Sequence, residues 1–233
     1  MWQPQVEALE AAGYGVLAPD LRGFGQRRFE EAPFSHVRDV EALVDGPVAV
    51  VGNSLGGRVA LELALCRPES VERLVLIAPG LPGWEWSDET RSGWTLEASA
   101  FERGDLDAAA EASLRMWVDG PRRSPEAVDP AMRAAVREMI LRSYALDQEA
   151  TESGAEEEPV LDPPVNERLT EIDCPTLVLV GDEDVGDMRA IAARIAESVP
   201  DARLATIEGA AHLPSLEKPV EVNRLLLDFL SAG

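Results

Sequence analysis

Residues 48–60 of the chain read VAVVGNSLGGRVA. The small and β-branched apolar residues 48–51 predict a buried strand. A Gly-x-Ser-x-Gly pattern, residues 52–56, then bends the chain, and the periodic apolar residues of 55–65 predict a helix. The stretch therefore predicts a strand, a tight turn and a helix, with Ser54 at the turn.

The spacing of the glycines has a steric reason. A turn tight enough to expose Ser54 at the end of a strand strains its backbone, and side chains at 52 and 56 would collide, so Gly52 and Gly56 remove them. The N–H of Leu55 then lies at the positive end of the helix without an intrahelical partner, where it can stabilise an oxyanion. The alternative is a Ser helix cap with glycines kept for packing. The strand before and the helix after favour a nucleophile.

Length, charge and apolar content limit which classes of protein this chain can belong to. A chain of 233 residues can bury one sizeable core, so we expect one domain with an insertion. The formal charge of −22, from 21 basic and 43 acidic residues, argues against nucleic-acid and anionic-membrane partners. The sequence has neither a recognisable leader peptide nor an apolar run approaching ~20 residues, so we predict a cytoplasmic protein.

Few residue types are available for metal or redox chemistry. Cys66 and Cys174 are unclustered, so they predict no disulfide framework and no metal site, and we expect both to be buried as small apolar residues. The only histidines are His36, at a helix start where a solvated role is expected, and His212, in a loop.

Apolar runs and breakers predict the remaining elements. We expect helices at 2–12, 35–45, 190–199 and 219–230, and buried strands at 14–18, 71–78, 176–180 and 202–207. Residues 19–25, PDLRGFG, predict a Gly-rich turn with an Asp–Arg pair.

The region from 80 to 165 differs from the rest. Its patterns are helical, at 95–103, 106–118 and 130–146, and it holds four of the five tryptophans. Residues 151–164, with three successive glutamates and three prolines, predict a solvated return linker.

The turn at Ser54 resembles the nucleophile elbow of the α/β-hydrolase superfamily. Residues 19–25 are similar to that family's Asp-x-Arg-Gly-x-Gly loop, and an all-helical insert between two strands resembles its cap. The resemblance implies a mainly parallel sheet flanked by helices, with a core of 1–79 and 166–233 and a helical cap of 80–165. Aromatic residues of the cap, Trp84, Trp94 and Trp117, would then roof an apolar pocket over Ser54, although for any single Trp the packing of the cap on the core is the favoured interpretation.

The resemblance also selects the partners of Ser54. The family's acid follows the strand at 176–180 in a Gly-x-x-Asp pattern, which points to Asp184, with Asp182 as the alternative; Asp187 fits a helix cap better. The general base follows the last strand in a Gly-x-x-His loop, which points to His212, in the chain order Ser, acid, His. These roles imply acyl transfer through a covalent intermediate on a small, largely apolar ester or lactone, with no cofactor and no metal.

The chain departs from the family at its start. Three family strands and a His-Gly loop that supplies a second oxyanion N–H precede the helix that begins here near Pro4. The resemblance therefore implies an N-terminally truncated fold. The protein could start upstream of Met1, strands 14–18 and 48–51 could pair directly, or a partner chain could complete the sheet. We expect a weak hydrolase or a homo-oligomer associating through the incomplete sheet.

Two rival functions stay open. A non-catalytic protein could use the same pocket to bind a small apolar ligand, and carbon–carbon bond hydrolysis or perhydrolysis could use the same three residues.

Overall fold

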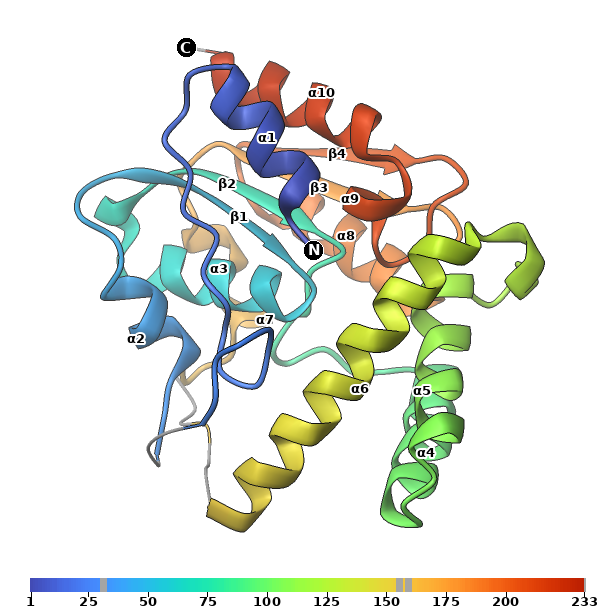
Figure 1. Ribbon diagram of the computed structural model, residues 1–233. Coiled ribbons are helices and arrows are strands. Elements are labelled where there is room, and N and C mark those ends of the chain that lie inside the picture. Colours follow the sequence, from blue (N-terminus) through green and yellow to red (C-terminus); the bar gives the residue numbers. More distant parts are fainter. Residues whose placement is uncertain (30–32, 154–156, 158–160, 233) are drawn as a thin grey trace.

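The computed structural model describes residues 1–29, 33–153, 157 and 161–232 (Figure 1). Its sheet has four parallel strands in the order β1-β2-β3-β4. Their bounds are Val48–Asn53 (β1), Val71–Ile77 (β2), Thr176–Gly181 (β3) and Ala202–Ile207 (β4). The two central strands are the most buried, which accounts for their continuous apolar sequences.

The register places the strand ends together. Asn53 pairs with Ile77, Ile77 with Leu179, and Gly181 with Ile207. Because the strands are parallel, the residues that follow them emerge at one edge of the sheet, which is where such sheets carry their sites. The loops that contain Ser54, Asp184 and His212 all begin there.

Helices cover both faces of the sheet, and alternate residues of β2 show how. Leu74 and Leu76 pack with α3 (Leu55–Cys66) and α8 (Gly186–Ser198) on one face. Val75 and Ile77 pack with α10 (Pro219–Ser231) on the other, where α1 (Gln3–Ala11) lies against α10 (Figure 1). The shorter helices are α2 (His36–Glu41), α7 (Val165–Arg168) and α9 (Pro214–Glu217).

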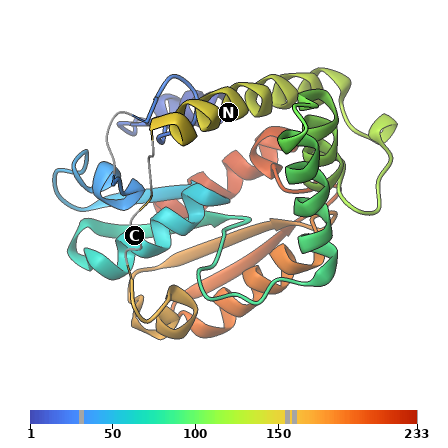
Figure 2. The same ribbon diagram turned by 90° about the horizontal axis from the view of Figure 1, so that it is seen from below.

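Three long helices lie between β2 and β3 in the chain. These are α4 (Asp88–Glu102), α5 (Leu106–Leu114) and α6 (Pro130–Ser153), and they share an apolar cluster of their own (Figure 2). A short π-helix, η2 (Arg115–Asp119), follows α5, and 3₁₀ turns lie at Pro68–Ser70 (η1), Pro125–Ala127 (η3) and Leu169–Glu171 (η4). The helices fall within the cap predicted for 80–165, although those boundaries stay a prediction. Of the predicted linker 151–164, residues 154–156 and 158–160 lie outside the described residues, and 151–153 continue α6.

The prediction of a strand at 14–18 is wrong. Gly13, with φ of 92°, ends α1, and the N–H of Tyr14 bonds to the Leu9 carbonyl, which turns the chain away from the sheet. Among the described residues this segment joins no strand ladder, and Leu17 is 66% exposed. Direct pairing of 14–18 with β1 is therefore excluded in this structure.

Three smaller predictions also need correction. Cys66 is exposed because it ends α3 beyond the packed turns, and Cys174 is half-buried. His36 is buried against the Phe34 ring, 5.2 Å away, and burial lowers its pKa. In the Gly-rich turn the Asp20 carboxylate accepts the Gln26 N–H, so the arginine of the motif, Arg22, instead pairs with Asp39.

Within the described residues, no helix is both long and apolar enough to cross a membrane.

Candidate active site

Ser54 lies at the turn between β1 and α3 in a strained conformation, with φ of 52° and ψ of −113°. Its N–H lies 3.0 Å from the Ile77 carbonyl oxygen and 3.1 Å from that of Ala78. Ala78 also has positive φ, 42°, and is fully buried. The hydrogen bonds from its N–H to the end of β2 therefore hold Ser54 in its strained conformation.

The glycines at this turn have unequal importance. A Cβ on Gly52 would lie 2.2 Å from the Gly56 carbonyl oxygen, so no side chain fits there. A Cβ on Gly56 would meet nothing within 4 Å, whereas one on Gly57 would lie 2.7 Å from Pro79. The steric role predicted for Gly56 is wrong: the second close approach is at Gly57, because α3 packs against the loop after β2 at that residue.

Asp184 and His212 meet beside the ends of β3 and β4. The Oδ2 atom of Asp184 lies 2.9 Å from Nδ1 of His212, and its Oδ1 accepts the Val185 N–H at 2.8 Å. Asp184 is fully buried and His212 is 5% exposed. Since the acid occupies Nδ1, Nε2 is the nitrogen left to exchange a proton with another group.

Asn53 joins the nucleophile strand to the histidine loop. Its side-chain amide donates to the Ile77 carbonyl at 2.8 Å and to the His212 carbonyl at 3.3 Å. The residue before Ser54 is therefore bonded to the main chain of His212. The described residues show no hydrogen bond from the Ser54 hydroxyl to the imidazole, a contact that often tightens only when substrate binds.

The other acids of the loop bind elsewhere. The Asp182 carboxylate accepts the Gly209 N–H at 2.7 Å, so it supports the histidine loop and does not bind the ring. Asp187 is not the expected helix cap: it accepts bonds from Ser87, Thr90 and the Trp84 indole. Burial opposes its ionisation, but these hydrogen bonds outweigh that effect and lower its pKa.

The tryptophans predicted to line a pocket occupy different places. The Trp117 ring lies 4.4 Å from the His212 ring, and the Trp117 carbonyl accepts the His212 N–H at 3.1 Å. Trp94 lies 6.5 Å from Trp117, and Trp86, which was not predicted, lies 4.8 Å from Trp94. Trp84 binds Asp187 through its indole, which gives it an anchoring role. Trp117 and Trp94 therefore extend as an aromatic row from the histidine.

Sequence reasoning missed the groups that support the loops. Asn53 sits at the variable position of the elbow motif, and Arg123 and Glu217 carry no motif at all, yet both contact the histidine loop. The one available signal was proximity in sequence: Asn53 is next to Ser54, Arg123 follows Trp117 closely, and Glu217 follows His212 closely. Among the described residues, no group of three or more His, Cys, Asp or Glu side chains could hold a metal ion.

This sheet, with its strained serine elbow and a buried Asp–His pair at the same edge, has the architecture of an α/β hydrolase. The chain belongs to the alpha/beta hydrolase family, whose sequence profile matches residues 1–225.

Relatives and solved structures agree with this class. A protein of Azorhizobium caulinodans that bears a carbamate hydrolase name is 28% identical over 98% of this chain and 85% of the relative. The 2-hydroxy-6-oxononadienedioate/2-hydroxy-6-oxononatrienedioate hydrolase of Cupriavidus pinatubonensis is 27% identical over 97% of this chain and 79% of its own length. The enol-lactonase structure from Burkholderia xenovorans matches with a TM-score of 0.75 at 25% identity, covering 99% of this chain and 85% of that one. These similarities support a hydrolase.

Proposed function

We propose that the protein is a serine hydrolase that cleaves a carboxylic ester or lactone of a small, largely apolar substrate. The observation that carries the proposal is the buried 2.9 Å bond between Asp184 and His212, held beside the strained Ser54 by the Asn53 bridge. The similarity to an enol-lactonase structure supports the choice of ester and lactone bonds.

The reaction would proceed in two acyl transfers. His212 Nε2 takes the proton of Ser54 as Oγ attacks the substrate carbonyl, and Asp184 stabilises the imidazolium through Nδ1–H. The negative oxygen of the tetrahedral intermediate would accept the N–H of Leu55, the first residue of α3. His212 then protonates the leaving alcohol, and water, deprotonated by the same nitrogen, releases the acid from Ser54. The proton first taken from Ser54 leaves with the alcohol, and Nε2 passes the proton taken from water to Ser54 Oγ as the acyl–oxygen bond breaks, so the enzyme returns to its starting state.

The aromatic row supports the preference for apolar groups. Trp117 and Trp94 are half-buried and extend outward from His212, so an apolar acyl or alcohol group bound over Ser54 would contact their rings.

A Ser54→Ala variant tests the proposal. Hydrolysis of short p-nitrophenyl esters should fall at least ~10³-fold, because the nucleophile is removed, while the thermal unfolding temperature stays close to that of the parent. Ser92→Ala, which changes a serine in α4 whose hydroxyl donates to the Asp88 carbonyl of the same helix, is the matched control and should keep full activity. A fluorophosphonate probe should label the parent at Ser54.

Two outcomes would contradict the proposal. Unchanged hydrolysis by Ser54→Ala would mean that another group is the nucleophile. A parent protein that binds apolar esters without hydrolysing them or reacting with the probe would favour the binding function.

A further inference from the structure

Arg123 leaves the cap just after η2 and reaches the histidine loop. Its guanidinium donates to the carbonyls of Val118 at 2.7 Å, Asp119 at 2.8 Å and Gly209 at 2.8 Å. Two of these carbonyls belong to the π-helix and one to the loop that carries His212. The side chain is only 13% exposed. Arg123 therefore joins cap and core through the fixed fork of its donors.

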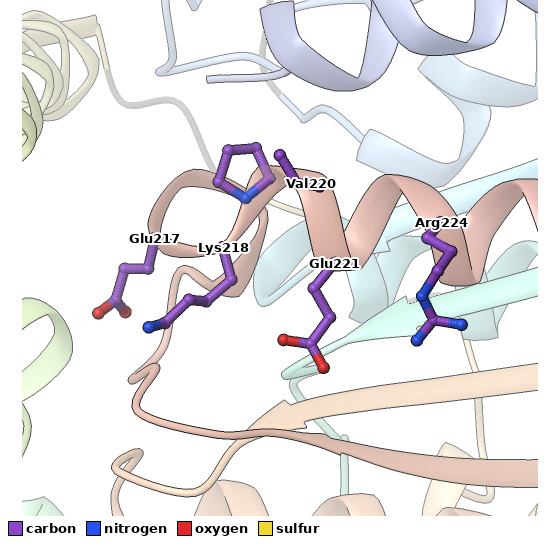
Figure 3. Close-up of a pocket in the computed structure, with 6 residues that line it drawn as sticks. Glu217, Lys218, Val220, Glu221 and Arg224 are labelled. Atoms are coloured by element: carbon purple, nitrogen blue, oxygen red, sulfur yellow. The ribbon is translucent and has the colours of Figure 1, made fainter.

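Glu217, which follows His212 in the chain, bonds both to Arg123 and to the loop that contains His212. One carboxylate oxygen accepts the Ala211 N–H at 2.7 Å, and the other lies 2.8 Å from Nη1 of Arg123. Ala211 directly precedes His212, so the carboxylate holds the peptide bond one residue before that of His212. Glu217 ends α9 and projects from the turn before α10, beside Lys218 and a surface hollow of about 530 Å³ (Figure 3).

The same end of the π-helix is also anchored through the side chain of Asp119. Asp119 is fully buried and binds Arg133 at 2.9 Å and Arg115 at 2.9 Å, which fixes η2 to α6. The carbonyl of Trp117, in the same π-helix, accepts the His212 N–H. Arg123 thus connects the π-helix to the loop before the histidine, directly at Gly209 and through Glu217 at Ala211.

The ion pair is poorly explained by stability alone. The Glu217 side chain is 6% exposed, and burial raises its pKa despite the bonds from Arg123 and Ala211. A buried ion pair contributes little net stability compared with apolar residues of similar volume, because both charges must leave water. What a buried, directional pair does supply is a defined geometry for the groups bonded to it.

We propose that Arg123 and Glu217 form a positioning pair that holds His212 in the orientation needed for proton transfer. The proposal rests on the function proposed above, because it assigns the pair to that reaction. The two residues contact the loop and not the reacting atoms. They are therefore positioning residues.

The test compares Arg123→Met, Glu217→Gln and the double variant with Arg224→Met. Arg224 forms an exposed pair with Asp228 on α10 and is the matched control. We expect kcat for p-nitrophenyl acetate to fall about 10- to 100-fold in each single variant, because small displacements of a catalytic group lower the rate by such factors. KM should change less than about twofold. The double variant should resemble the worse single variant, since the pair acts as a unit.

A second readout does not depend on activity. The chain has only two histidines, so the ring signals of His212 and His36 can be separated by nuclear magnetic resonance. Loss of the pair should shift or broaden the His212 signals and leave those of His36 unchanged, whereas Arg224→Met should alter neither. Arg123→Lys keeps the charge without the fork, so it should recover part of kcat, and it replaces Arg123→Met if that variant does not fold.

Unchanged His212 signals and unchanged kcat in folded variants would overturn the proposal, as would a loss of stability without either effect. If the parent protein itself hydrolyses no ester, the proposed function fails, and the His212 signals still decide whether the pair positions the ring.

Discussion

The two halves of the candidate site are held in different ways. Around His212, side chains from three elements bond to the loop: Asp182 to the Gly209 N–H, Glu217 to the Ala211 N–H and Arg123 to the Gly209 carbonyl. Around Ser54, the backbone supplies the restraint, through the close approach at Gly52 and the bonds to the end of β2. The half with the proposed acid and base therefore depends on polar contacts, and the half with the proposed nucleophile, called the nucleophile half below, depends on steric fit.

The two halves also differ in how many other elements contact them. The loop after β4 bonds to η2 through the His212 N–H and the Trp117 carbonyl, and the loop after β3 bonds through Glu183 to Arg122, just after η2. Among the described residues, β1 pairs with one strand, β2. The segment 14–18, which precedes α2 and β1 in the chain, is mostly exposed. Substitutions of the groups that restrain each half should consequently differ: loss of rate with little loss of stability at the contacts to the His212 loop, and loss of stability at the glycine contacts beside Ser54.

Asp184→Asn should have the largest effect on rate. The uncharged amide cannot stabilise the imidazolium and favours the wrong tautomer of His212, so kcat should fall about 10³- to 10⁴-fold. Asp182→Asn is the matched control, because an amide oxygen can still accept the Gly209 N–H, and its kcat should stay within about tenfold of the parent. Steady-state kinetics of both variants make the comparison. A larger loss in Asp182→Asn would reverse the assignment of the acid.

Gly52→Ala should have the largest effect on stability. Its Cβ would lie 2.2 Å from the Gly56 carbonyl oxygen, and since backbone atoms on both sides must move, we expect a loss of about 3 kcal/mol or more in the free energy of unfolding. Gly56→Ala meets nothing within 4 Å and lies in α3, so it should be neutral or stabilise by up to about 1 kcal/mol. Denaturant unfolding measures both. Equal effects would refute the steric account of the nucleophile half.

Asp187→Asn tests whether the polar contacts of Asp187 also stabilise the start of α4. The carboxylate binds Ser87, Thr90 and Trp84 at the start of α4, so the amide should reduce the free energy of unfolding by about 1–3 kcal/mol near pH 7. Because its folded pKa lies below the ordinary value of 3.8, this stabilisation is complete above about pH 4 and is lost as the pH falls through the folded pKa. The difference between parent and variant should therefore shrink in acid. A difference independent of pH would contradict the cause given for the shift.

Leu17→Glu should have the smallest effect on the single chain. Leu17 is 66% exposed, so the free energy of unfolding should change by less than about 0.5 kcal/mol. We propose that copies associate through the open side of β1 and that the exposed Leu17 side chain takes part in that contact, so a charge at this position should weaken the association. Light scattering at increasing concentration compares parent and variant. A parent that stays monomeric throughout would end the proposal of a homo-oligomer.

The elbow could be predicted from local patterns, and the pairing of Asp184 with His212 from the resemblance to the α/β-hydrolase superfamily. A strand, two glycines and a helix must place Ser54 at a sheet edge, and parallel strands must bring the loops after β3 and β4 to the same edge. Chain order could then select His212, but it could not separate Asp184 from Asp182. That separation depends on which carboxylate meets Nδ1 and which meets Gly209.

The errors came from contacts between distant segments. Residues 14–18 have strand-like apolar character, but a strand also needs a partner edge, and no local pattern reports one. The burial of His36 depends on Phe34 and on packing against α3, and the role of Gly57 depends on Pro79, which follows β2. Trp84 shows the same limit, because its partner Asp187 lies 103 positions away.

The bond between the Trp117 carbonyl and the His212 amide links substrate access to reactivity. Trp117 belongs to η2, so any outward swing of the cap that admits substrate must stretch this bond and withdraw the indole from the imidazole. An open enzyme would then be a poor catalyst, and bond cleavage would be confined to the closed form. If the cap helices do move outward to admit substrate, their return should time turnover, with a viscosity-sensitive kcat as its signature.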